Sequence, residues 1–465
     1  MSSRNRNAVL AALAVVTLGA QAAGATVTNP TVTGPIAATV PPGDPSHNYP
    51  FFATNADLAA YGYIEEEFFF EGLANRYNTP PLVTGTVIDT GHPYRTRMVV
   101  RRPSSAHNFS GIVLLEWQNV SSGYDFDASW QASQDHMMQR GYAWVGVSVQ
   151  RAGIHTPGTG LRAWNASRYG TLDVTQNGQI LDDSLCYDIY SQSAQAVRHP
   201  AGIDPMGGLP VKLVLAIGAS QSANRLSLYH NSVHPLAGAV DAFSFYVGGT
   251  ALRTDLDIKV FKTISESDVA VVGQAFLSEP DSDHFRRWEV AGTSHIDLHL
   301  LQEWGPVQVR DGVAGIPPAC ARPPLSRIPY YFVANAATDH LVRWVTQNIA
   351  PPIAPRLNVV ALGPPVVIAR DSLGNAFGGV RVSQFAVPIA TNTGVNSGPG
   401  FCFLFGSFEA FSAATLDALY PNHGTYVSQA SQAAYEAMQN GFVVLEDTIT
   451  TIQQAAQSGI GKPVH

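Results

Sequence analysis

Short apolar runs recur along the middle of the chain and alternate with segments of helical periodicity. Apolar runs bounded by turns are typical of buried strands, and helical segments between them are typical of parallel sheets. The predicted strands span residues 94–102, 111–117, 143–149, 211–217, 239–247, 258–264 and 287–290, and the predicted helices span 130–139, 183–197 and 223–230. This alternation predicts an α/β fold with a mostly parallel, doubly wound sheet.

The chain is longer than such a sheet requires. Residues 90–305 contain the predicted core, interrupted by an insertion at 151–182 that we interpret as a cap. Residues 26–89 are interpreted as an N-terminal arm, and residues 306–465 as a C-terminal extension integrated with the core. With 465 residues the chain is long enough for three domains, but no fixed-period repeat divides it. We therefore expect one enlarged domain.

The first residues resemble an export signal. Arg4 and Arg6 precede an uncharged run at 8–20, and small residues follow up to Ala22 and Ala25. A basic start, a short apolar stretch and small residues are typical of a cleaved signal peptide, here residues 1–25. The run is too short to cross a bilayer easily, although a retained membrane anchor stays an alternative. We expect a secreted or periplasmic protein with no stable membrane insertion after cleavage.

Charge is sparse and slightly acidic. Only 13% of the residues are charged, the net charge is −8 and 45% of the residues are hydrophobic, which excludes a disordered chain. A nucleic-acid partner is excluded as well, because phosphate binding needs clustered Lys and Arg. The adjacent basic pairs are Arg101–Arg102 and Arg286–Arg287, at strand ends, where we expect them to face solvent.

The chain has three cysteines. Cys186 lies in the predicted helix 183–197, where a buried free thiol fits. Cys320 and Cys402 lie in irregular stretches that a cross-link would stabilise, and an exported protein meets oxidising conditions. We therefore predict a disulfide between Cys320 and Cys402.

The sequence Gly218-Ala219-Ser220-Gln221-Ser222 joins the strand 211–217 to the helix 223–230. A strand, a tight turn and a helix are the setting of a nucleophile elbow, which exposes a serine hydroxyl at the carboxyl edge of the sheet. Ser222 stands where the usual G-x-S-x-G pattern has glycine. The alternative is a serine-rich loop that caps the helix.

A serine nucleophile needs a general base and an acid that orients it. The strand 258–264 is followed by Ser-Glu-Ser-Asp-Val, and the strand 287–290 is followed by a loop that ends in His295. Parallel strands end at one edge of the sheet, so both loops should lie beside Ser220. We predict His295 as the base and Asp268 as the acid, with Glu266 as the alternative acid.

A further donor set must stabilise the negative charge that develops on a carbonyl oxygen during acyl transfer. The backbone N–H of Gln221 is one candidate, and that of Gln118, in the loop after the strand 111–117, is the second. Glu116, at the end of that strand, is expected to be structural. Four aromatic residues are candidates for an apolar substrate pocket: Trp164, Tyr169, Phe403 and Phe405.

A metal site is not expected. His295, Asp297 and His299 alternate along one segment, but no second cluster of metal-ligating side chains accompanies them. The reaction that the serine, histidine and acid perform needs no cofactor, so none is expected.

Six stretches carry a resemblance to a known superfamily: LLEWQNVSSGYD, GYAWVGVSVQRAGI, IGASQSANRL, SESDV, RRWEVAGTSHID and RDSLGNAFGGVRV. The sequence resembles the α/β-hydrolase superfamily, and more narrowly it is similar to large exported bacterial alpha/beta-hydrolase-domain proteins. The resemblance implies the α/β-hydrolase fold, supports the triad Ser220, Asp268 (or Glu266) and His295, and implies that the G-x-S-Q-S elbow is tolerated.

These observations predict an exported serine hydrolase that cleaves carboxylic esters, small or polymeric, through an acyl-enzyme. The same triad would also serve an amidase or a peptidase. A noncatalytic binding protein on a hydrolase scaffold is the alternative from another class, because a fold does not determine a function. The identity of the ester and the oligomeric state are left open.

Overall fold

A ten-stranded sheet organises the chain in the computed structural model, which describes residues 27–277, 279–313, 315, 319–363 and 366–462. The expected signal peptide, residues 1–25, lies outside the described residues. Six neighbouring strands run parallel, in the spatial order β10 (Phe285–Val290), β9 (Lys259–Ser265), β8 (Ala242–Tyr246), β7 (Leu213–Ala219), β4 (Ile112–Trp117) and β5 (Ala143–Val147). All six were predicted from the apolar runs, and the mostly parallel α/β fold is confirmed.

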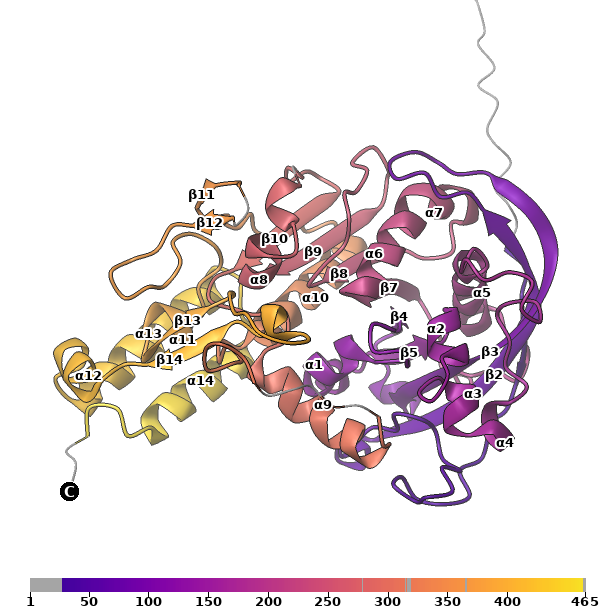
Figure 1. Ribbon diagram of the computed structural model, residues 1–465, viewed down its shortest axis with the longest axis horizontal. Helices are drawn as coiled ribbons and strands as arrows, with labels where there is room; N and C mark the ends of the chain where they lie inside the picture. The colour runs from indigo at the N-terminus through magenta and orange to yellow at the C-terminus, as the bar shows by residue number, and fades with distance from the viewer. Residues whose placement is uncertain (1–26, 278, 314, 316–318, 364–365, 463–465) are drawn as a thin grey trace, which may run out of the picture.

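The other end of the sheet is built by a long antiparallel hairpin, β2 (Tyr63–Tyr77) and β3 (Val87–Pro103). β3 continues the sheet from β5, and the short strands β1 (Thr31–Thr33) and β6 (Ala201–Gly202) complete it. In Figure 1 this indigo hairpin curves around one side of the molecule. The sequence pattern predicts part of β3 but not β2.

The hairpin buries an unusual number of charges. Arg97 is fully buried and pairs with Glu67 at 2.9 Å, and the Glu67 carboxylate also pairs with Arg168 at 2.5 Å. Arg101 bonds Glu65 at 2.7 Å and Asp127 at 2.5 Å. Each cation has a carboxylate within hydrogen-bond distance, which is the condition under which buried charges are tolerated.

The expectation that the two basic pairs face solvent is therefore wrong. All four arginines are buried: Arg101, Arg102, Arg286 and Arg287. Carboxylates from neighbouring strands and loops reach them, as when Arg102 bonds Glu66 at 2.6 Å. These partners come from other segments of the chain, so the local sequence does not reveal them.

Helices cover both faces of the sheet. α1 (Ala128–Gln139) and α10 (Tyr330–Gln347) pack on one face, against β7 and β9 respectively. α6 (Gln221–Leu228) packs on the opposite face, against β7, and α5 (Cys186–Arg198) packs against β2. Cys186 is a buried free cysteine, as predicted. The two layers leave the carboxyl ends of the parallel strands as the place where loops can form a site.

Short elements and the C-terminal extension surround this core. They are α2 (Arg151–His155), α3 (Leu161–Trp164), α4 (Ala166–Tyr169), α7 (His234–Ala237), α8 (Glu266–Ala270), α9 (Leu298–Arg310), β11 (Val359–Ala361), β12 (Val367–Ile368), α11 (Ser383–Ala386), β13 (Ala390–Thr393), β14 (Ser407–Ala410), α12 (Ala413–Leu419), α13 (His423–Gln439) and α14 (Leu445–Gln457), with single-turn or irregular helices η1 (Leu58–Tyr61), η2 (Ala106–Asn108), η3 (Tyr229–Val233), η4 (Gln274–Phe276) and η5 (Cys402–Leu404). In Figure 1 the yellow helices α12, α13 and α14 lie at the end of the molecule opposite the indigo hairpin.

Backbone pairing joins the extension to the sheet. Val380 pairs with Val290, the last residue of β10, in a parallel bridge. The Val380 N–H donates to the Glu289 carbonyl at 2.7 Å, and the Ala291 N–H donates to the Val380 carbonyl at 3.0 Å. The sheet thus ends against a segment of the extension.

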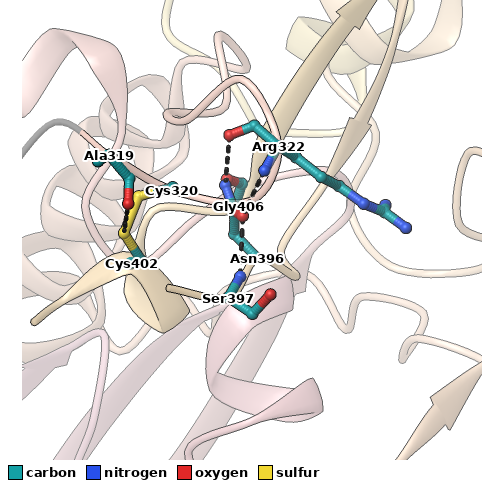
Figure 2. Close-up of a disulfide and its surroundings, with 7 residues drawn as sticks. All are labelled: Ala319, Cys320, Arg322, Asn396, Ser397, Cys402 and Gly406. Atoms are coloured by element: carbon teal, nitrogen blue, oxygen red, sulfur yellow. Dashed lines mark hydrogen bonds between the residues drawn. A yellow bond between two sulfur atoms is a disulfide. The ribbon is translucent and has the colours of Figure 1, made fainter. Parts of the chain in front are cut away.

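The predicted disulfide is confirmed. Cys320 and Cys402 are bonded, with a sequence separation of 82 and Cα atoms 5.5 Å apart (Figure 2). The bridge joins the segment after α9 to η5. Among the described ranges, no helix combines the length and the apolar character needed to cross a membrane.

Candidate active site

Ser220 lies at a strained turn between β7 and α6. Its φ of +57° and ψ of −118° fall in a region that a residue with a side chain rarely adopts. Such strain is held only where the surroundings enforce it, and it is found at nucleophile elbows. The structure therefore places Ser220 in the geometry that the sequence motif predicts.

Ser222, the departure from the usual glycine, stabilises this turn. Its hydroxyl donates to the Ala219 carbonyl at 2.8 Å and accepts the Ala219 N–H at 2.9 Å. Ser222 is fully buried, so both bonds are protected from water. A serine at this position thus contributes hydrogen bonds that glycine lacks.

Gly248, in the loop after β8, packs directly behind the nucleophile. A Cβ atom at Gly248 would lie 3.0 Å from the Ser220 Cα and 3.0 Å from the Ser220 carbonyl oxygen. β8 holds the same turn directly, because the Ser220 N–H donates to the carbonyl of Tyr246, the last residue of β8, at 3.0 Å. Two adjacent strands therefore determine where the serine hydroxyl lies.

His295 lies in the loop after β10 and contacts both other triad candidates. Its Nε2 is 2.8 Å from the Ser220 Oγ, and its Nδ1 is 2.7 Å from the Asp268 Oδ1. His295 and Asp268 are buried. A carboxylate on Nδ1 favours the tautomer in which Nε2 is free to accept the serine proton.

Asp268 is held rigidly at the start of α8. Its Oδ2 accepts the Ser265 N–H at 2.8 Å and the Ser265 hydroxyl at 2.5 Å, while the Ser265 Oγ accepts the Asp268 N–H at 3.2 Å. This reciprocal pattern is a capping box. One carboxylate oxygen is thereby anchored, and the other is aimed at His295.

Glu266, the alternative acid, is oriented away from His295. Its Oε2 accepts the Gly292 N–H at 2.7 Å. Its Oε1 accepts the Gly394 N–H at 2.9 Å and an Arg370 N–H at 2.6 Å. Glu266 thus links the ends of β9 and β10 to the C-terminal extension through these hydrogen bonds.

The loop after β4 borders the elbow. The Asn119 side-chain amide donates to the Ala219 carbonyl at 2.9 Å, and the Val120 N–H is 3.4 Å from the Gln221 Oε1. Gln221 is the first residue of α6, where a backbone N–H has no partner within the helix. The Gln118 N–H is directed at the Val147 carbonyl, 3.5 Å away, so the structure does not bring Gln118 to the site.

Glu116, at the end of β4, was expected to be structural, and its hydrogen bonds hold the start of α1, which follows this loop. Its carboxylate accepts the Ser129 N–H at 2.8 Å, the Trp130 N–H at 3.3 Å and the Trp144 indole N–H at 2.7 Å. Burial raises the pKa of Glu116 from 4.5 to about 8. Glu116 is thus a buried acceptor at the start of α1.

A cavity of about 60 Å³ adjoins the Ser220 hydroxyl. Its lining comes from the elbow, the loop that carries His295, the β4–α1 loop with the start of α1, the end of β8, α9 and the chain at η5. The lining residues are Asn119, Ser121, Ser122, Phe126, Ala128, Ala219, Ser220, Tyr246, Val247, His295, Ile296, Leu300, Trp304, Phe401 and Leu404. None of these is Lys, Arg, Asp or Glu.

The four aromatic residues expected at a pocket do not line this cavity. Trp164 and Tyr169 pack beneath the N-terminal arm, where the Tyr169 hydroxyl bonds Glu67 at 2.8 Å. Phe403 is 44% exposed and Phe405 is buried elsewhere. Trp304 was missed, although it follows Leu300 by four residues on α9, a spacing that places both on one helix face.

His299 does not join His295. Its Nε2 donates to the Ala132 carbonyl at 3.1 Å, and its ring stacks on Tyr331. Among the residues that the structure describes, no group of three His, Cys, Asp or Glu side chains is arranged to hold a metal ion.

Parts of the chain are similar to solved structures at low identity. An α/β serine hydrolase without a lid from Xanthomonas campestris is 13% identical, with a TM-score of 0.29, and the match covers 53% of this chain and 97% of that chain. Acetyl xylan esterase 1 from Thermoanaerobacterium sp. is 14% identical, with a TM-score of 0.22, over 40% of this chain and 50% of that chain. The Geobacillus stearothermophilus carboxylesterase is 14% identical, with a TM-score of 0.22, over 33% of this chain and 30% of that chain.

The chain thus spans half or less of the length of these two esterases. No match was found among curated proteins. A family model described as alpha/beta hydrolase domain matches residues 32–453, which include the whole sheet, the elbow and most of the C-terminal extension. Together with the parallel sheet and the serine at its elbow, this match shows that the chain belongs to the alpha/beta hydrolase domain family.

Proposed function

We propose that the protein is an exported serine hydrolase that cleaves carboxylic esters through an acyl-enzyme. The observation that carries the proposal is the unbroken hydrogen-bonded series from Ser220 through His295 to Asp268, with contacts of 2.8 and 2.7 Å. A serine, an imidazole and a buried carboxylate in this order form the arrangement that activates a hydroxyl group for attack on a carbonyl.

In the first half of the reaction the Ser220 Oγ attacks the ester carbonyl carbon. The hydroxyl proton moves to the His295 Nε2, and the Asp268 carboxylate stabilises the imidazolium that forms. The carbonyl π electrons move to its oxygen, which the backbone N–H of Gln221 stabilises as a hydrogen-bond donor. When this tetrahedral intermediate collapses, the bond to the alcohol oxygen breaks and His295 gives that oxygen its proton.

In the second half a water molecule replaces the alcohol. His295 takes a proton from the water, the hydroxide attacks the acyl carbon, and the bond to the Ser220 Oγ breaks. The proton then returns from His295 to the Ser220 Oγ, and the carboxylic acid leaves. The site is thereby restored with no net change in its protons.

An active-site label tests this proposal directly. A fluorophosphonate should modify wild-type protein at Ser220, and Ser220→Ala and His295→Ala should each lose labelling. Ser428→Ala is the matched control, because Ser428 lies on the exposed surface of α13. A wild-type protein that is folded but unlabelled would refute the serine mechanism.

Paired substrates test the preference for esters. p-Nitrophenyl esters and p-nitroanilides of the same acyl group differ only in the leaving atom. We expect turnover of the esters, because an alkoxide or phenoxide leaves from the tetrahedral intermediate more readily than an amine. Faster turnover of the anilides would favour the amidase alternative instead.

The proposed export is supported by the signal-like residues 1–25 and by the Cys320–Cys402 disulfide, which persists in oxidising compartments. We expect the mature chain outside the cytoplasm, with an N-terminus close to residue 23 or 26. Fractionation of the producing cell and N-terminal sequencing of the protein would check this expectation. A full-length chain that stays in the cytoplasm would contradict it.

A further inference from the structure

The wall of the cavity opposite the elbow belongs to the C-terminal extension. Phe401 immediately precedes η5, and Leu404 is the last residue of η5. Both line the cavity together with Leu300 and Trp304 of α9. Cys402 lies between the two wall residues and is fully buried in its disulfide with Cys320. A covalent cross-link therefore holds the segment that limits the cavity.

Hydrogen bonds around the disulfide fix the same segment (Figure 2). The Asn396 amide donates to the Arg322 carbonyl at 3.2 Å and to the Gly406 carbonyl at 2.6 Å. The Asn396 Oδ1 accepts the Arg322 N–H at 3.1 Å. The chain before and after η5 is thus attached to the chain that follows Cys320.

The wall is also joined to the catalytic loop. The Ile296 N–H, one residue after His295, donates to the Leu404 carbonyl at 3.1 Å. Ile296 itself lines the cavity. A displacement of η5 would therefore change both the cavity and the loop that carries the base.

The size and chemistry of the cavity indicate what it accepts. Its volume is about 60 Å³, whereas an engineered apolar cavity of about 150 Å³ binds benzene. In proportion to that volume, the cavity beside Ser220 holds about two to four non-hydrogen atoms. The lining carries no charged side chain other than His295 when that residue is protonated, so a charged acyl group would lose its hydration without gaining a partner.

We propose that this cavity is an acyl pocket for short, uncharged acyl groups of about two to four carbons, and that the disulfide-held wall at Phe401 and Leu404 sets this limit. The inference rests on the proposed ester hydrolysis and names its substrate class. The alcohol part of the ester points to the open side of the cavity, so the limit applies to the acyl part alone.

A chain-length series tests the limit. For p-nitrophenyl acetate, butyrate, hexanoate and octanoate, the wild-type kcat/KM should be highest at acetate or butyrate and should fall by about tenfold or more at octanoate, because methylenes that do not fit cost on this scale. Leu404→Ala removes an isopropyl group from the wall and should raise kcat/KM for hexanoate relative to acetate by about tenfold. Leu209→Ala is the matched control, because Leu209 has the same 8% exposure as Leu404 and lies outside the lining.

The disulfide is tested separately. Cys320→Ser with Cys402→Ser, or wild-type protein reduced with dithiothreitol, should lose the preference for short acyl groups through KM, and reoxidation of the reduced wild type should restore it. Cys186→Ser, at the free cysteine, should keep the wild-type preference. If the double variant fails to fold, Leu404→Ala alone decides the question.

The outcomes separate this inference from the proposed function. If the fluorophosphonate labels Ser220 but no ester is cleaved, the proposed ester hydrolysis fails. If esters of all lengths are cleaved equally by the wild type, or if Leu404→Ala leaves the length profile unchanged, the acyl-pocket inference fails and the serine hydrolase stands.

Discussion

At the scale of single residues, two carboxylates two positions apart, Glu266 and Asp268, have different hydrogen-bond partners. The Asp268 carboxylate accepts bonds from Ser265 and His295, whereas the Glu266 carboxylate bonds Arg370 and two backbone N–H groups. Both are buried, so burial does not distinguish them. The hydrogen-bond partners distinguish the two carboxylates. They predict different effects of replacing Asp268 and of replacing Glu266 by the neutral amide.

We expect Asp268→Asn to lower kcat by about 10⁴-fold while the protein stays folded, because an amide on Nδ1 favours the wrong tautomer of His295. Glu266→Gln should keep most of the activity and lower the free energy of unfolding by about 1–3 kcal/mol, because Arg370 loses its anionic partner. Esterase kinetics and urea unfolding of both variants measure these effects. The reverse result would assign Glu266 as the acid.

Glu116 predicts a pH dependence of stability. Its pKa in the folded protein is raised to about 8, so between about pH 4.5 and pH 8 the folded state holds a proton that the unfolded state releases. The free energy of unfolding should therefore fall as pH rises through this window, by up to about 1.4 kcal/mol per pH unit from this group. Below pH 4.5 both states are protonated and the full stability is present.

Glu116→Gln carries no titrating proton and should flatten this slope. Urea unfolding of wild type and variant at several values between pH 6 and pH 8 compares the two directly. Equal slopes would show that the Glu116 carboxyl titrates alike in the folded and unfolded chains.

At the scale of elements, the strand ends made the meeting of Ser220, Asp268 and His295 predictable. Each of Ser220, Asp268 and His295 stands within five residues of a strand end, and parallel strands end at one edge, so three local patterns imply one long-range arrangement. The cavity wall lacks such a signal. Its orientation depends on one turn of η5, which directs Phe401 and Leu404 into the cavity and leaves Phe403 outside.

β2 likewise could not be predicted from its own sequence pattern. Its sequence contains three consecutive glutamates, Glu65 to Glu67, which resemble a solvated segment. In the sheet Glu65 lies opposite Arg101 in register, and Glu67 pairs with Arg97 and Arg168. The partners that bury these charges are distant in sequence, so local periodicity contains no information about them.

The loop after β8 predicts the sensitivity of the elbow to its support. Gly248→Ala should lower kcat/KM by about 10²-fold, because the added Cβ would displace Ser220 and a small misplacement of a nucleophile costs about this much. Gly459→Ala is the matched control, since a Cβ there meets no atom within 4 Å. Wild-type activity in Gly248→Ala would show that the elbow can shift without loss.

At the scale of the whole molecule, the C-terminal extension supplies parts of the core. α10 covers β8 and β9 with buried Phe332, Val333, Leu341 and Trp344, and Glu266 bonds Gly394 from the sheet side. Residues from Asn119 to Leu404 line the cavity beside Ser220. The predicted hydrolase core therefore depends on residues beyond its own boundary.

A chain truncated after Arg310 tests this dependence. We expect it not to fold, because the loss of α10 exposes one face of the parallel strands. Circular dichroism and limited proteolysis would detect the loss, and a chain truncated after Val444, which retains α10 and lacks α14, is the control. Cooperative unfolding of the shorter chain would instead identify the extension as a separate domain.

The contact of Val380 with β10 has one more consequence. The outer edge of a sheet exposes unpaired N–H and C=O groups that can recruit a strand from another molecule and begin aggregation. Val380 occupies two of these groups at the end of β10, and the opposite edge is only the two-residue strand β6. Val380 thus removes part of the template that β10 would offer to a strand of a neighbouring chain.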